Sequence, residues 1–142
     1  MKKAHTTKHD HEMLETATPQ ERATIQDLHL ELIRRSSFNF LDGPRVVRDL
    51  EAHRDLWLAV LIDRDGMPWG SDMIKLRDIP ENVWNVDKLF VLARDERAAR
   101  RLTEFAERWR ADEVDVQGEE ATERALGRGR VSPERLVTFW WD

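Results

Sequence analysis

The chain of 142 residues contains no cysteine and no tyrosine, although it has 6 tryptophans. Without cysteine it can form no disulfide, carries no thiol nucleophile and cannot bind a metal through thiolates. The absence is compatible with a reducing compartment, where proteins do not depend on disulfides. It therefore excludes several classes of secreted, thiol-dependent and zinc-thiolate proteins.

Long apolar runs are also missing. The longest, Leu56–Ile62, is far shorter than the roughly 18 residues that a membrane-spanning helix needs. Polar residues follow the basic start Met1-Lys2-Lys3, where a secretory signal peptide would have an apolar segment. We therefore expect a cytoplasmic protein with no membrane association.

An excess of positive charge is absent as well, since the net charge is -5 at pH 7. Nucleic-acid binding relies on basic residues that neutralise phosphates, so this charge argues against a nucleic acid as the partner. With 40% hydrophobic and 36% charged residues, the composition is that of a folded globular protein. We expect a flexible, histidine-containing tail at residues 1–17 and a single domain at residues 18–142.

The first predicted elements are two N-terminal helices. Thr18-Pro19-Gln20-Glu21 combines an N-cap, a first-turn proline and a capping-box glutamate, and predicts a helix that runs to about Arg35. Asp42-Gly43-Pro44 predicts the start of a second, short helix. Apolar segments then predict strands at 56–62, 73–76, 89–93, 112–117 and 136–141, with helices between the last three.

The strand–helix–strand–helix–strand order over residues 89–141 indicates parallel neighbours, because each helix returns the chain across one face of the sheet. The continuous apolar run Leu56–Ile62 indicates a strand covered on both faces. We predict an α/β fold with a mixed five-stranded sheet, two N-terminal helices and a C-terminal β-α-β-α-β unit. Ligands of such sheets bind beyond the carboxyl ends of the strands, which places a crevice near Asp63, Arg94-Asp95 and Gln117-Gly118.

Asp63 and Asp65 are the sharpest candidates for catalysis. A strand that ends in two carboxylates two residues apart suits Mg²⁺, which prefers carboxylate oxygens. Leu61-Ile62-Asp63-Arg64-Asp65-Gly66 resembles the nucleophile loop of haloacid-dehalogenase-type phosphatases, without the hydroxyl residue that usually follows the glycine. The resemblance implies a Mg-dependent phosphoryl-transfer or hydrolytic enzyme. The alternative, which we favour, is a hairpin turn built from Asp and Gly.

The histidines form two candidate groups. His5, His9 and His11 could converge on a transition metal, and the alternative is an incidental polar tail. His29 and His53 follow apolar helix positions and could form a buried acid–base pair. Here the alternative is that each is a hydrogen-bonded structural histidine. We favour the structural interpretation of both groups.

Arg94 and Arg97 flank the start of the clearest predicted helix and could hold an anion such as phosphate. Asp95 and Glu96 occupy the same positive helix end, so a capped and solvated helix start is the interpretation that we favour. The chain has no glycine-rich dinucleotide fingerprint, and we expect no cofactor.

Tryptophans outside the predicted core are the most telling residues. Trp69 and Trp84 lie in loops that flank the second predicted strand. Trp140 and Trp141 are consecutive, so on a strand they point to opposite faces, and on an edge strand one of them would be partly exposed. Because tryptophan is frequent at interface hot spots, these four residues are candidates for an interface. Closure of a core covered on two sides is the alternative.

Three functional hypotheses follow. The first is a non-enzymatic protein-interaction or regulatory module that binds a protein partner or self-associates. The second is the Mg-dependent enzyme that uses Asp63 and Asp65. The third is an acidic antagonist that covers a basic partner protein. We favour the first, because the chain has tryptophans outside core patterns and no catalytic constellation.

Overall fold

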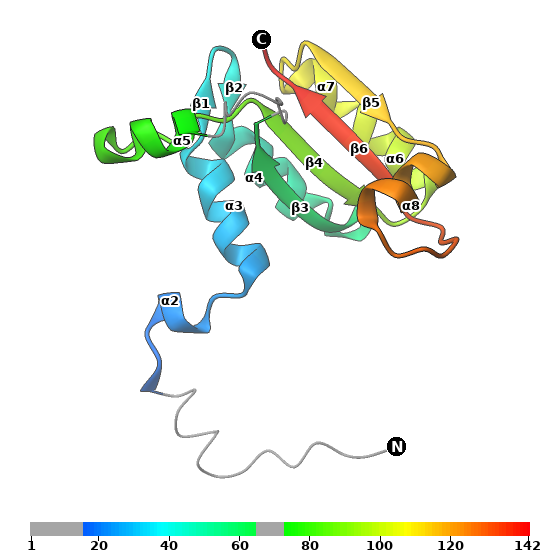
Figure 1. The fold of residues 1–142 in the computed structure, drawn as a ribbon, viewed down its shortest axis with the longest axis horizontal. Helices are drawn as coiled ribbons and strands as arrows, with labels where there is room; N and C mark the ends of the chain where they lie inside the picture. The colour runs from blue at the N-terminus through cyan, green and yellow to red at the C-terminus, as the bar shows by residue number, and fades with distance from the viewer. Residues whose placement is uncertain (1–15, 65–72) are drawn as a thin grey trace.

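The computed structural model describes residues 16–64 and 73–142. It contains a four-stranded antiparallel sheet in the order β3-β4-β6-β5 and a separate two-stranded hairpin (Figure 1). The sheet strands are β3 (Trp57–Asp63), β4 (Lys88–Ala93), β5 (Glu113–Val116) and β6 (Arg135–Trp140). None of the described helices is long and apolar enough to cross a bilayer. The predicted α/β class is confirmed.

The first predicted helix forms as two helices with a break between them. Thr18 caps α2 (Pro19–Arg22), and its side chain accepts a hydrogen bond from a backbone N–H of the first turn. A new helix, α3 (Ile25–Arg35), starts directly afterwards because Thr24 and Asp27 form a complete capping box. The second cap competes with continuation of the first helix, and the chain turns between them.

The helices α3 and α4 (Gly43–Ala52) form a hairpin through the short strands β1 (Ser37–Phe38) and β2 (Leu41–Asp42). Gly43, the first residue of α4, lies against the backbone at the end of α3. A Cβ atom at this position would lie 2.0 Å from the carbonyl oxygen of Ile33. Any side chain at residue 43 would therefore force the helices apart.

The predicted mixed five-stranded sheet is wrong. Residues 73–76, expected as a strand, belong to the helix α5 (Met73–Asp78), which the 3-10 helix η2 (Ile79–Glu81) follows. So short an apolar segment fits helical and strand periodicity equally well. Met73 and Leu76, three residues apart, are both more than half exposed.

The predicted parallel neighbours do not form either. The strands β4 and β5 run in the same direction, because α6 (Glu96–Thr103) and α7 (Phe105–Arg108) carry the chain back along the sheet. However, β6 lies between them and is antiparallel to both. The helix α8 (Glu119–Leu126) stays at the end of the sheet where β5 ends and β6 begins (Figure 1). A connection that starts and ends at the same end of a sheet joins antiparallel strands.

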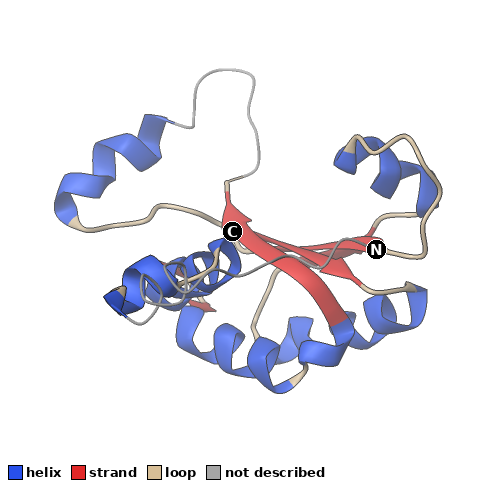
Figure 2. Ribbon diagram, turned by 90° about the horizontal axis from the view of Figure 1, so that it is seen from below, coloured by secondary structure: helices blue, strands red, loops and turns tan. Residues whose placement is uncertain are grey.

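Helices cover the two faces of the sheet unequally (Figure 2). A layer formed by α4, α6 and α7 covers one face, while α3 packs against α4 and along the edge strand β3. On the other side, α5 and α8 lie near opposite ends of the strands. No described helix covers the middle of that second face.

The core between the sheet and the helix layer contains three fully buried tryptophans, whose indole N–H groups all have acceptors. Trp57 donates to the carbonyl of Leu50 at 2.9 Å, and Trp141 donates to the carbonyl of Trp109 at 3.0 Å. Trp109 donates to the carboxylate of Asp49 at 2.8 Å. These bonds remove the cost of burying an unpaired indole N–H group.

The free edge of β3 is closed by a side chain. The Val60 N–H donates to Oε1 of Gln26, and Nε2 of Gln26 donates to the Val60 carbonyl, both at 2.9 Å. On an antiparallel edge strand, the backbone groups of alternate residues point away from the sheet. The amide of Gln26 therefore takes the place that a neighbouring strand would occupy.

Candidate functional site

The middle of the uncovered sheet face carries side chains from all four strands. Directly opposite residues on neighbouring strands share a face, and so do alternate residues along one strand. The strand register therefore defines this surface, which we call the open face. Its rows are Asp63-Lys88-Trp140-Glu113, Leu61-Phe90-Thr138-Asp115 and Ala59-Leu92-Leu136-Gln117.

The open face is unusually apolar. Antiparallel sheets with one face in water usually alternate apolar and polar residues along each strand. Here Phe90, Leu92, Leu136 and Trp140 lie on the open face, all of them partly exposed, and Leu61 is 41% exposed. From the continuous apolar strands we expected helices on both faces of the sheet. The described helices cover the full length of only one face.

A hollow of about 420 Å³ crosses β4, β6 and β5 on the open face. Phe90 and Trp140 contribute aromatic rings to its lining, and Glu113 and Asp115 line its β5 side. The indole Nε1 of Trp140 makes a long hydrogen bond of 3.4 Å to the carboxylate of Asp87, which orients the ring. The hollow thus combines an aromatic surface with two carboxylates on its β5 side, while Lys88 lines its β4 side.

The β5 side of the hollow belongs to the most acidic part of the chain. Six carboxylates and no basic residue lie between Arg110 and Arg124. Within the described ranges, Glu113 forms no ion pair, and Asp115 accepts a hydrogen bond of 2.6 Å from Nε2 of Gln117. Both carboxylates are exposed to solvent. They give this side of the open face a negative potential.

The four predicted interface tryptophans have different positions. Trp140 lies on the open face and is partly exposed, whereas Trp141 points to the opposite side and is fully buried. Trp141 therefore belongs to the core, and its side chain is not available on the surface for a partner. Trp69 lies outside the described residues.

Trp84 lines a separate hollow between α3 and the residues around η2. Leu32, Ile79 and Val83 also line it. The indole Nε1 of Trp84 is buried and has no partner among the described residues, and Nζ of Lys75 lies 5.5 Å from the ring centre. This hollow is distinct from the open face and has no comparable group of unpaired charges.

Asp63 is engaged in local contacts. Its carboxylate pairs with Lys75 and accepts a hydrogen bond from the Arg64 N–H at 2.7 Å. Asp65, the second carboxylate of the predicted Mg²⁺ site, lies outside the described residues. Residues 16–64 and 73–142 contain no group of three or more His, Asp and Glu side chains that could hold a metal ion.

The crevice predicted beyond the carboxyl ends of the strands does not form. Because β3 and β4 are antiparallel, Asp63 lies opposite Lys88, at the start of β4. Arg94 follows β4 at the other end of the sheet, and the strand register places Gln117 at that end too. The antiparallel order therefore separates residues that a parallel order would bring together.

Arg94 and Arg97 lie at the start of α6 and are both exposed. They line a small hollow together with Asp55 and Asp95. The side chain of Asp95 accepts a hydrogen bond from the Ala98 N–H at 2.7 Å, so a carboxylate already occupies the positive end of the helix. This arrangement matches a capped helix start more closely than an anion site.

The histidines are dispersed. His53 forms a hydrogen bond of 2.9 Å between its Nδ1 and the carbonyl of Asp49, and its ring packs edge-on against Phe105. His29 is partly buried on α3, and its Nδ1 has no partner among the described residues. No described interaction joins the two rings. His5, His9 and His11 lie outside the described residues.

Glu113, Asp115 and Phe90 are candidate site residues that the sequence did not reveal. Residues 112–117 alternate, which predicts that Val114 and Val116 pack inward; Val114 packs against the core, whereas Val116 is 36% exposed. The same alternation puts Glu113 and Asp115 on the opposite face. Their proximity to Trp140 depends on the insertion of β6 beside β5, which no local pattern encodes.

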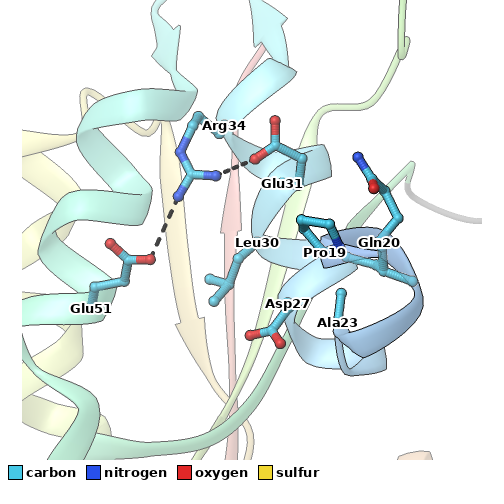
Figure 3. Close-up of a pocket in the computed structure, with 9 residues that line it drawn as sticks. Pro19, Gln20, Ala23, Asp27, Leu30, Glu31, Arg34 and Glu51 are labelled. Carbon is cyan, nitrogen blue, oxygen red and sulfur yellow. Dashed lines mark hydrogen bonds and ion pairs between the residues drawn. The ribbon is translucent and has the colours of Figure 1, made fainter. Parts of the chain in front are cut away.

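A further hollow, of about 340 Å³, is formed by the N-terminal helices (Figure 3). Arg34 reaches across it to Glu51 at 3.5 Å and also pairs with Glu31. These paired charges tie α3 to α4. Their role is therefore accounted for by the packing of the helical hairpin.

Comparison with protein-family models, with curated proteins and with solved structures found no match. Evidence about function therefore comes from the geometry and chemistry of the surfaces described above.

Proposed function

We propose that this protein is a non-enzymatic protein-interaction or regulatory module that binds a protein partner on its open face, around Trp140. The observation that carries the proposal is an apolar sheet surface that one layer of helices leaves uncovered. Phe90 and Trp140 give this surface aromatic side chains of the kind that dominate interface energetics, and Leu61 adds exposed apolar area.

The arrangement of polar residues supports binding over catalysis. Asp63 is paired with Lys75, His53 is bonded to a backbone carbonyl, and Asp95 caps a helix. Each of these groups takes part in a contact that stabilises the described fold. In contrast, the apolar residues of the open face are not packed beneath a layer of described helices.

A capture experiment with matched variants tests the proposal. The full chain is immobilised, and proteins retained from a cell extract are compared for wild type, Trp140→Ala and Leu61→Glu. Ile25→Ala is the control, because Ile25 is 77% exposed on α3, away from the open face. We expect one partner that wild type and Ile25→Ala retain equally and that both open-face variants lose by about tenfold, as truncation of a hot spot requires.

Circular dichroism and thermal unfolding of each variant establish that it is folded. Sedimentation of the wild type identifies the case in which the partner is a second copy of the chain. Equal retention of the partner by the folded Trp140→Ala and Leu61→Glu variants contradicts the proposal. So does a wild-type chain that is monomeric and retains nothing.

A further inference from the structure

The chemistry of the hollow on the open face specifies what kind of segment the partner presents. We infer that it is a basic segment, which places a lysine or arginine side chain over Trp140 and against Glu113 and Asp115. The inference rests on the proposed function and adds the charge of the partner to it. Three observations support the inference: the strand register, the carboxylates that form no ion pair with any described residue, and the lining of the hollow by both aromatic and acidic residues.

The register brings an aromatic ring and a carboxylate side by side. Glu113 lies directly opposite Trp140, and Asp115 lies directly opposite Thr138, the next residue of β6 on the same face. The Cβ atoms of such cross-strand neighbours are about 5 Å apart. A cation above the indole would therefore be within reach of both carboxylates. Cation–π attraction and charge-assisted hydrogen bonds would act on the same group.

Lys88 lines the β4 side of the hollow, whereas no described lysine or arginine lines its β5 side. Residues 111–123 contain no lysine or arginine. Arg135, which precedes the open-face residues of β6, donates to three backbone carbonyls of its own loop and lies 3.8 Å from Glu119. Lys88 lies on the far side of Trp140, with its Nζ 5.5 Å from the centre of the Phe90 ring. The negative potential at Glu113 and Asp115 is therefore left for a partner to neutralise.

The alternatives fit the surface less well. A purely apolar segment would cover the rings but would also withdraw two carboxylates from water without pairing them, which is costly. A nucleic acid would bring its phosphates against the same carboxylates. A small metal ion would find only two carboxylates, both solvent-exposed. A segment with one basic residue among apolar ones satisfies both parts of the hollow.

Selection from a random octapeptide library displayed on phage tests the inference. The library is first depleted on the folded Trp140→Ala variant and then selected on the immobilised full wild-type chain. We expect the enriched peptides to contain lysine or arginine next to apolar residues. Replacement of the basic residue of the best peptide by uncharged citrulline or norleucine should weaken binding by about tenfold, as loss of a charge-assisted bond does.

Two double variants of the protein test whether Glu113 and Asp115 bind the basic residue of the peptide. The double variant Glu113→Gln and Asp115→Asn should weaken binding of the same peptide by about tenfold. The control is Glu104→Gln with Glu107→Gln, which removes the same charge from exposed residues at the α6–α7 junction, on the helix-covered side. The control should bind the peptide as the wild type does. Titration calorimetry measures the binding of the basic peptide and of its neutral version to the wild type, the double variant and the control.

The outcomes separate the inference from the function on which it rests. Enriched peptides that are acidic, or apolar without a basic residue, overturn the inference and leave the open face as a docking site. Equal binding of the neutral peptide, or equal effects of the two double variants, overturns it in the same way. If no peptide is enriched in a Trp140-dependent manner, the inference fails, and the capture experiment alone then decides the proposed function.

Discussion

Arg128 organises the loop between α8 and β6 through one guanidinium. It contacts Glu123 and Ser132 at 2.6 Å each, and Glu134 at 3.4 Å. Hydrogen bonds from Ser132 and Arg128 hold the pKa of Glu123 below its ordinary value of 4.5, with Ser132 the larger cause. The same two residues lower the pKa of Glu134. The loop is thus held closed by interactions of two carboxylates, whose charge depends on pH.

The lowered pKa of Glu123 predicts a loop that loosens in acid. A carboxyl group whose pKa is lower in the folded state stabilises that state above its unfolded pKa, here 4.5, and the contribution is lost as the pH falls through the folded pKa. We expect the amide protection factors of residues 127–134, which correct for the intrinsic exchange rate, to fall as the pH falls below about 4.5. Exchange measured by NMR between pH 6 and pH 3 checks this.

Two variants make the acid prediction specific. Glu123→Gln should lower the protection of the loop amides at pH 6. It should also remove most of the pH dependence of this protection, because the side chain of residue 123 no longer titrates. Glu120→Gln is the control, since Glu120 is exposed on the same helix and should leave the wild-type pH profile unchanged. Protection factors of the loop that stay constant between pH 6 and pH 3 would contradict the assignment.

Some individual residues could be assigned from the sequence because their role is local. Thr18, Asp42 and Asp95 were predicted to start helices, and each accepts the expected backbone hydrogen bond. Glu113 could not be assigned, because its neighbour Trp140 is distant in the sequence. Capping depends on residues a few positions apart, whereas the open face depends on strand order.

At the scale of elements, the contact between α3 and β3 depends on Gln26. Replacement of this residue by leucine removes both hydrogen bonds to Val60 and leaves a strand edge without its closing group. At about 1 kcal/mol for each bond, we expect the free energy of unfolding to fall by about 2 kcal/mol. Urea unfolding followed by circular dichroism measures this change.

The same substitution should also promote association through the β3 edge, because an open strand edge pairs with other edges. Sedimentation of the Gln26→Leu variant as a function of concentration tests this. Gln20→Leu is the matched control, since Gln20 is exposed on α2. An unchanged unfolding midpoint for Gln26→Leu, together with a monomer at all concentrations, would show that the edge does not need Gln26.

The helices and strands could be predicted better than their arrangement. Helix starts and apolar strands have local signals. The strand β5 lies within a predicted strand region, and β3, β4 and β6 each overlap one and extend a single residue beyond it. The parallel arrangement was wrong because α8 looks like a crossover helix in the sequence but stays at one end of the sheet. The expected cover on both faces was wrong because an apolar strand looks the same whether its second face packs on helices or remains uncovered.

The whole molecule has two unlike sides, one closed by helices and one that is apolar and acidic. This difference predicts how ionic quenchers reach the tryptophans. Trp57, Trp109 and Trp141 are fully buried, whereas Trp140 is partly exposed beside Glu113 and Asp115. We expect the ratio of caesium to iodide quenching at equal ionic strength to be higher for the protein than for the uncharged reference N-acetyltryptophanamide, because the acidic surface attracts cations.

Trp140→Phe should remove this preference for caesium, because it removes the emitting group next to the two carboxylates. Trp84→Phe is the control, since Lys75 lies near that ring and the preference for caesium should persist or increase. Stern–Volmer plots for the three proteins provide the comparison. A preference that is equal in wild type and Trp140→Phe would contradict the placement of the acidic surface.

The position of β6 has a consequence for how the sheet is assembled during synthesis. This strand is central in the sheet, yet it follows the other three in the chain. Until it has been made, β5 has no partner and β4 has a free edge, so the sheet closes late. A cut within residues 127–134 would give two fragments. The larger would carry β3, β4 and β5 with a gap of one strand between β4 and β5, and the smaller would carry β6, which fills that gap. The molecule is therefore a natural candidate for fragment complementation, in which the two pieces regain the fold only when they meet.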